Sequence, residues 1–146
     1  IRLLAGSALP APAAEAGCRA EYVGGTISQF ASRVAGRIHV TDPEVFVFEA
    51  KKAGLEVPYE QVNLLEYGQQ ASRRVLLAAA ISPFFLLTKS RKHFLTISFK
   101  DGGGKQQAMV FQVDKSDVRA LLAGLEARTG LKVDYTDGEA RKVGGG

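Results

Sequence analysis

One short run in this sequence has the residue types of a phosphate-binding loop. Gly102-Gly103-Gly104-Lys105 places three glycines before a lysine, and glycine-rich loops of that kind bind phosphates when they lead into a helix. Here Gln106 stands where such a loop requires serine or threonine, and a strand-like pattern follows. The run therefore predicts the tip of a β-hairpin, because glycine tolerates the positive φ angles of tight turns.

The residues that commonly bind metals or act as nucleophiles are few and scattered. His39 and His93 are the only histidines, each in a predicted strand, and Cys18 is the only cysteine. This spacing lacks the clustered ligands of a metal site and the nucleophile-and-base arrangement of covalent catalysis. We therefore predict that the chain is not an enzyme and binds neither a metal nor a cofactor.

The positive charge is concentrated in one segment. The formal net charge is +4, with a pI near 9.3. No acidic residue lies between Glu66 and Asp101, and the rest of the chain is slightly acidic. The cations of this window are Arg73, Arg74, Lys89, Arg91, Lys92 and Lys100.

Most of these cations flank an uncharged, apolar insert. Val75–Thr88 reads VLLAAAISPFFLLT. As a helix it would cover about 21 Å, too short for the roughly 30 Å hydrocarbon core of a bilayer, and Pro83 would kink or end that helix. An apolar surface rimmed by cations is typical of a segment that lies at the interface of an anionic membrane.

This pattern predicts a non-catalytic binding or adaptor module that associates with an anionic membrane surface through the insert. Nucleic acid is not expected as a partner, because the uncharged run interrupts the positive surface that phosphates require. The predicted contact residues are Arg73, Arg74, Leu76, Leu77, Ile81, Phe84, Phe85, Leu86, Lys89, Arg91 and Lys92.

Other interpretations of the insert stay open, since soluble monomers rarely expose a large apolar patch. The chain is alternatively an accessory or structural subunit whose insert is buried against a partner protein or in a homo-oligomer. The insert can also be a buried segment folded onto its own sheet. A small-ligand pocket between a C-terminal helix and the mouth of a barrel is a further interpretation.

The composition is that of one globular domain with short tails. The chain has 146 residues, of which 46% are hydrophobic and 23% charged, as in ordinary folded proteins. Residues 1–20 are rich in alanine and proline and resemble the end of a secretory signal peptide, which indicates an exported or cell-envelope protein, or else a flexible tail. The domain is expected over 21–135, with a flexible tail at 136–146.

Within that domain the pattern is mainly β, with one helix near the end. Val118, Leu121, Leu122 and Leu125 form one apolar stripe, which predicts a helix that begins after a Ser116 cap and ends before Gly130. Strands are predicted at Glu21–Ile27, Gly36–Val40, Glu44–Glu49, Leu55–Val57, Leu64–Gln69, His93–Lys100 and Gln107–Val113, with a short edge strand at Leu131–Asp134.

Two of these strands carry specific expectations of burial. Glu44–Glu49 has no polar gap, which favours a strand buried on both faces or capped by a helix. His93–Lys100 alternates, which places Leu95, Ile97 and Phe99 on one face and Phe94, Thr96 and Ser98 on the other. We expect about seven antiparallel strands, arranged as a barrel or sandwich, plugged at one end by the helix, with an apolar helical insert.

That element order resembles bacterial pleckstrin-homology-like or GRAM-like domains. The resemblance covers Tyr22 to about Tyr135 and rests on the Pro58-Tyr59-x-x-Val62 turn, the hairpin HFLTISF…MVFQV and the closing helix RALLAGLEARTG. It implies a non-enzymatic module that binds lipid headgroups, peptides or partner proteins. Lipid-binding members carry a Lys…Arg-x-Arg pattern around the first two strands, whereas this chain offers Arg33 and Arg37, so phosphoinositide binding of that kind is not expected.

Overall fold

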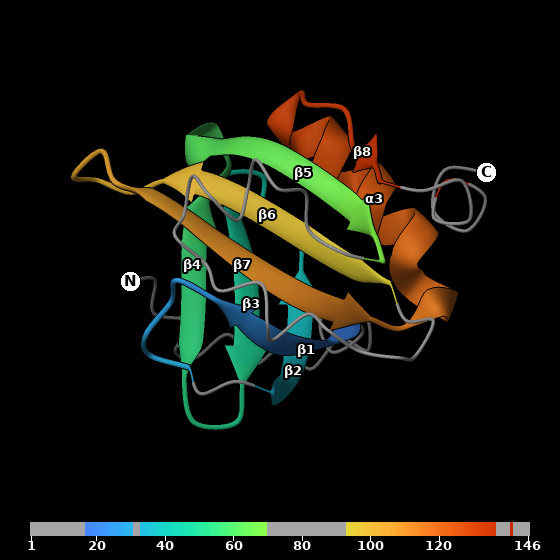
Figure 1. Cartoon of the computed structure of the whole chain (residues 1–146), viewed down its shortest axis with the longest axis horizontal. Coiled ribbons are helices and arrows are strands. Elements are labelled where there is room, and N and C mark those ends of the chain that lie inside the picture. The colour runs from blue at the N-terminus through green and yellow to red at the C-terminus, as the bar shows by residue number, and fades with distance from the viewer. Residues whose placement is uncertain (1–16, 31–32, 70–92, 137–140, 142–146) are drawn as a thin grey trace.

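The computed structural model describes residues 17–30, 33–69, 93–136 and 141 (Figure 1). The strands are β1 (Cys18–Gly25), β2 (Val34–His39), β3 (Val45–Ala50), β4 (Gly54–Pro58), β5 (Val62–Gly68), β6 (Phe94–Lys100), β7 (Gln106–Val113) and β8 (Asp134–Tyr135). A single 3-10 turn, η1 (Tyr59–Gln61), joins β4 to β5, and the helix α3 (Lys115–Thr129) follows β7.

All eight strands belong to one sheet in the order β4-β3-β2-β1-β7-β6-β5-β8. Neighbours pair antiparallel, except that β8 pairs parallel with β5. The predicted mainly β fold with a C-terminal helix is confirmed. The expectation of a closed barrel is not met, because the described strands form an open sheet whose edges are β4 and β8.

The open sheet is folded over, so that its two halves enclose a common core. In Figure 1, β2, β3 and β4 lie behind β5, β6 and β7 and cross them steeply. Phe48 on β3 and Phe111 on β7 have ring centroids 4.9 Å apart, and Phe46 lies 5.9 Å from Phe111. Because β3 and β7 are not neighbours in the sheet, these contacts require the two halves to face each other.

The helix α3 closes one end of this core. Its predicted stripe is confirmed, because Val118, Leu121, Leu122 and Leu125 are all buried in the core cluster. The helix packs against β1 and η1. The turn η1 also contributes Tyr59 to the same cluster.

The ends of α3 follow local chemistry, with one correction. The N-cap is Asp114 rather than Ser116, and the Asp114 side chain accepts a hydrogen bond from the Ser116 backbone N–H at 3.1 Å. An aspartate at this position satisfies one of the helix's free N–H groups. At the other end, Gly130 has φ 78°, the left-handed conformation expected of a C-terminal glycine.

Strand boundaries differ from prediction by a few residues. The first strand begins at Cys18, three residues before the predicted start, because its pairing with β2 extends to the Cys18–Ile38 pair. The last strand is a two-residue piece at the end of the predicted Leu131–Asp134 segment and beyond it. The hairpin is confirmed, with Leu95 opposite Phe111 and Ile97 opposite Met109.

Burial of the third strand differs from prediction, whereas the two faces assigned to β6 are confirmed, because Leu95, Ile97 and Phe99 belong to the core cluster and Phe94, Thr96 and Ser98 do not. The third strand alternates, with Phe46 and Phe48 buried and Val45 and Val47 only half-buried, so the expectation of burial on both faces is wrong. The alternating pattern of β6 is real, but every residue from Phe94 to Phe99 is buried. Both faces of β6 are therefore covered, although the second face carries threonine and serine.

Candidate functional site

The predicted membrane or partner contact lies outside the described residues. This holds for the insert Val75–Thr88 and for the flanking Arg73, Arg74, Lys89, Arg91 and Lys92. The signal-peptide-like residues 1–16 and most of the predicted C-terminal tail also lie outside. The described residues do define the two points between which the insert runs, namely Gln69 and His93.

Those two points lie close together beside a cleft. Gly68 at the end of β5 pairs with Phe94 at the start of β6, so the chain leaves and re-enters the sheet at the same end. Tyr67 and His93 both line a cleft of about 750 Å³. The remaining lining residues come from β1, β2, β7 and the start of α3: Arg19, Ala20, Glu21, Ala35, Gly36, Gln112, Val113, Asp114 and Lys115.

Two stacked rings form one wall of the cleft. The rings of Tyr67 and His93 lie 5.5 Å apart at an interplanar angle of 21°, and both residues are buried. Tyr135 of β8 contacts the Tyr67 ring edge-on at 6.4 Å. The β8 strand therefore fixes Tyr67, which in turn fixes the imidazole at the point where the chain returns to β6.

Charged side chains form the rim. Arg19 pairs with Asp114 at 3.4 Å, and Glu21 pairs with Arg33 at 3.2 Å. Both carboxylates that line the cleft are therefore matched by arginines. Lys115 is an exposed cation on the same rim.

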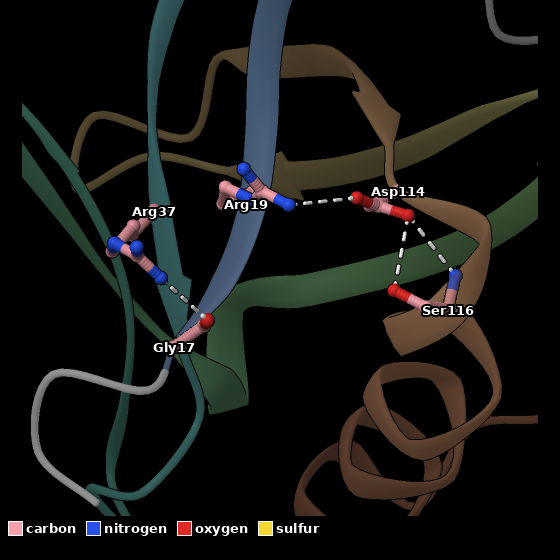
Figure 2. A network of polar contacts seen from close by, with 5 residues as sticks. All are labelled: Gly17, Arg19, Arg37, Asp114 and Ser116. Carbon is pink, nitrogen blue, oxygen red and sulfur yellow. Dashed lines mark hydrogen bonds and ion pairs between the residues drawn. The ribbon is translucent and has the colours of Figure 1, made fainter. Parts of the chain in front are cut away.

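Figure 2 shows how the cations are held. Arg19 and Arg37 are directly opposite each other on β1 and β2, an arrangement that is unfavourable for like charges unless other groups offset it. Arg37 donates a hydrogen bond to the Gly17 carbonyl at 3.2 Å, while Arg19 turns toward Asp114. Hydrogen bonds from the Ser116 N–H and hydroxyl, with Arg19 nearby, hold the pKa of Asp114 below its usual value.

Gln112 gives the cleft a buried polar group. Its side-chain Oε1 is buried and has no hydrogen-bond partner among residues 17–30, 33–69 and 93–136. A buried acceptor without a donor is costly, so a donor group from a ligand or a water would be favoured there. The cleft thus combines stacked rings, one amide acceptor and a rim in which Arg19 and Lys115 lie beside Glu21 and Asp114.

Of the other residues considered for metal binding or catalysis, Cys18 and His39 lie on the neighbouring strands β1 and β2, where Cys18 is opposite Ile38, whereas His93 lies at the cleft. His39 pairs with Glu49 at 3.2 Å on the exposed side of β2 and β3. Cys18 is half-buried, and burial raises the pKa of its thiol. Across the described ranges, no group of three histidine, cysteine or acidic side chains could hold a metal ion.

The glycine-rich run is confirmed as a hairpin tip. Asp101 Oδ1 accepts hydrogen bonds from the Gly103 and Lys105 backbone N–H groups, each at 2.9 Å. Gln107 donates to the other oxygen of Asp101 at 2.8 Å. The backbone N–H groups that would bind a phosphate in a P-loop are used here to close the turn.

No protein-family model matches the sequence, and no curated protein compared with it is similar. Within the part of the chain that the structure describes, no helix has the length and apolar character needed to cross a membrane.

Proposed function

We propose that this protein is a non-catalytic binding module of pleckstrin-homology-like architecture that associates with an anionic membrane surface. The contact is the basic-flanked insert together with the rim of the cleft. Seven strands in chain order, the β6–β7 hairpin and the closing helix α3 support the architecture. The finer likeness to that family belongs to the proposal.

One observation carries the proposal: the segment that leaves and re-enters the sheet beside the cleft carries five cations and no acidic residue between Gln69 and His93. Its neighbours Tyr67 and His93 line the same cleft as Arg19 and Lys115, and the carboxylates there are paired with Arg19 and Arg33. Five further cations lie within the connecting segment. The cations of the segment would therefore form one electrostatic surface beside a rim whose charges balance.

The energetics favour a reversible, salt-sensitive association. Each lysine or arginine near an anionic bilayer contributes about 1 kcal/mol, and this contribution falls off within a Debye length of about 10 Å at 0.1 M salt. Several cations acting together are thus sufficient for binding at low ionic strength. The same cations lose most of their effect when salt is raised.

Vesicle co-sedimentation tests the proposal. The wild-type chain is expected to pellet with phosphatidylserine-containing vesicles at low salt, to be released at high salt, and to stay in solution with pure phosphatidylcholine vesicles. The variant Arg73→Glu/Arg74→Glu is expected to lose pelleting. The matched control is Lys51→Glu/Lys52→Glu, which makes the same change in net charge at an exposed turn between β3 and β4.

Two results would contradict the proposal. The first is no pelleting of the wild-type chain at low salt. The second is an equal loss in both charge-reversed variants, because that would show a response to net charge rather than to this end of the domain.

A second candidate function is favoured by the uncharged apolar run Val75–Thr88, because soluble monomers rarely expose a large apolar patch. In this alternative the chain is an accessory or structural subunit whose insert is buried against a partner protein or in a homo-oligomer. Light scattering coupled to size-exclusion chromatography distinguishes the two, because a homo-oligomer would be independent of lipid. A monomeric mass at every protein concentration tested would contradict the homo-oligomer interpretation.

A further inference from the structure

The cleft has a polar lining that its own residues leave incomplete. Gln112 of β7 lies directly opposite Glu21 of β1 and, on its other side, opposite Phe94 of β6. The buried Oε1 of Gln112 accepts no hydrogen bond from the residues that the structure describes. Neither neighbouring side chain can donate one, because an ionised carboxylate is only an acceptor and a phenyl ring has no polar hydrogen.

Glu21 and Gln112 therefore place two acceptors side by side. Residues directly opposite each other on antiparallel strands have Cβ atoms about 5 Å apart. The Glu21 carboxylate pairs with Arg33 at 3.2 Å, and its side chain is still 33% exposed. Gln112 as a whole is half-buried, and because its last torsion is soft, a rotation of the amide presents the oxygen to the cleft. An ammonium completes such a pair, since it has three donors and no acceptor.

The charges around the cleft favour a ligand that is not a simple cation. The lining holds two cations and two carboxylates, namely Arg19, Lys115, Glu21 and Asp114. Asp114 pairs with Arg19 at 3.4 Å, whereas Lys115 forms no ion pair within the part of the chain that the structure describes. Lys115 would repel a ligand that is only a cation. A ligand that also carries a carboxylate pairs with Lys115 and keeps the charges balanced.

We propose that the cleft binds a short peptide with free termini, with its ammonium at Glu21 and Gln112 and its carboxylate at Lys115. Gln112 and Lys115 are three residues apart, so their Cα atoms are separated by at most about 10 Å. The two residues of a dipeptide span about 7 Å, which suits this separation. The cleft volume of about 750 Å³ lies in the range of small-molecule sites, and the small Ala35 and Gly36 of β2 leave room for the peptide side chains.

This inference goes beyond the proposed function and does not depend on it. The proposed membrane association is carried by the cations of the segment between Gln69 and His93. The ligand of the cleft is soluble and has no net charge, and every residue assigned to it lies among those that the structure describes. Either proposal can therefore hold without the other.

Titration of the full, ¹⁵N-labelled chain with three probes, followed by NMR chemical shifts, tests the proposal. The probes are alanyl-leucine, its N-acetyl derivative and its C-terminal amide. We expect alanyl-leucine to bind at millimolar concentrations, with the largest shifts at the backbone N–H groups of the cleft. Acetylation removes the charged donor and should weaken binding about tenfold. Amidation removes the carboxylate and should weaken binding by up to about fivefold, as expected for an exposed ion pair.

Two variants assign these effects to residues. In Lys115→Gln, alanyl-leucine and its amide should bind equally, while acetylation should still weaken binding about tenfold. In Gln112→Leu, the effect of acetylation should shrink because one of the two acceptors is gone. The matched control is Lys105→Gln, which makes the same change in charge at the exposed hairpin tip and should keep both effects. The comparison of the three probes on the wild-type chain needs no substitution, so it decides the proposal even if Gln112→Leu does not fold.

Several results would overturn the proposal. The first is the absence of shifts at the cleft with millimolar alanyl-leucine, which would leave water as the partner of Gln112. Equal binding of all three probes would show recognition of apolar side chains rather than of both termini. Tighter binding of the acetylated probe would show a site for anions. Loss of both effects in Lys105→Gln would show a response to net charge alone. Vesicle pelleting is measured separately, so none of these results decides the proposed function.

Discussion

The contact between Phe48 and Phe111 is the most direct test of the folded-over sheet. These residues lie on β3 and β7, which are separated by β2 and β1 in the sheet order. In a flat sheet they would not meet, yet their ring centroids are 4.9 Å apart and both side chains are fully buried. An interaction energy between them therefore measures whether the two halves of the sheet enclose one core.

A double-mutant cycle with Phe48→Leu and Phe111→Leu isolates that energy. Leucine keeps the sites apolar and leaves a smaller cavity than alanine does. Each single substitution is expected to lower the free energy of unfolding by about 1 to 3 kcal/mol. Because aromatic pairs contribute about 0.5 to 1.5 kcal/mol beyond the area they bury, the double variant should lose less than the sum by an amount of this size.

The matched control is the cycle of Phe48→Leu with Phe94→Leu. Phe94 is also buried, at 4% exposed, but lies outside the core cluster, on the other face of β6. Substitutions at separate sites add to within about 0.5 kcal/mol, so this cycle should show no coupling beyond that. Urea unfolding followed by circular dichroism gives all the free energies.

The reasoning would be refuted by a Phe48–Phe111 coupling no larger than the control. Such a result would mean that β3 and β7 do not pack against each other in solution. The coupling free energy can be measured only if the double variant still folds. A domain of this size has a stability of about 5 to 15 kcal/mol, so we expect the double variant to remain folded in the absence of urea.

Three further predictions concern single sites. Burial raises the pKa of Tyr59 to about 12. Between about pH 10 and 12 the phenol ionises in the unfolded chain but not in the folded one, so the free energy of unfolding should fall over this range. In urea unfolding at a series of alkaline pH values, Tyr59→Phe should remove this part of the fall. The pKa of Asp114 is lowered from 3.8, so the contribution of its carboxylate to stability is lost as the pH falls through the folded-state pKa. In urea unfolding at a series of acid pH values, the free energy of unfolding should therefore fall less steeply for Asp114→Asn than for the wild-type chain. Gly130→Ala should cost about 1 kcal/mol because of its positive φ, measured by thermal unfolding, whereas Gly102→Ala, at an open position without a positive φ, should cost less.

The elements that could be predicted from the sequence are those with local determinants. The β6–β7 hairpin is predicted because alternation and a glycine-rich tip lie within one stretch of chain, and the observed pairs Leu95–Phe111 and Ile97–Met109 confirm it. The apolar stripe of α3 is likewise contained in one helix. The cap was assigned to Ser116 because serine is a common N-cap, but Asp114 precedes it and accepts its N–H.

Burial on a second face could not be predicted, because it depends on what packs there from elsewhere. The run Val45–Ala50 looks fully apolar, yet its valines are half-buried because the outer side of β3 is partly open to solvent. Thr96 and Ser98 look like surface residues, yet both are buried on the outer face of β6. Hydroxyl side chains tolerate this when hydrogen-bonded, and Ser98 donates to the Gln107 carbonyl at 3.2 Å.

The cleft could not be predicted either, because its residues come from distant parts of the chain. The cleft forms because β1 pairs with β7 as well as with β2. This pairing brings Arg19 of β1 to the same cleft as Tyr67 of β5 and Gln112 of β7. The sequence gives no local sign of that pairing. Arg33 and Arg37 were considered only as an incomplete lipid-binding pattern, and Arg19, which lines the cleft, was not singled out.

The strand β1 connects the core to the candidate site. It pairs with both β2 and β7, and its register with β7 shifts between Tyr22 and Gly24, an irregularity of the bulge type, which increases local twist and bends a strand. At Gly25 any side chain would collide with the Ala108 carbonyl, and φ is 141°, so glycine is required there.

The bend has two consequences at opposite faces of the same strand. On the inner face it brings Tyr22 within 5.7 Å of the Phe111 ring, at the centre of the folded-over core. On the outer face it carries Arg19 and Glu21 to the end of the sheet where β5 ends and β6 begins. One strand therefore contributes Tyr22 to the core and Arg19 and Glu21 to the rim of the cleft.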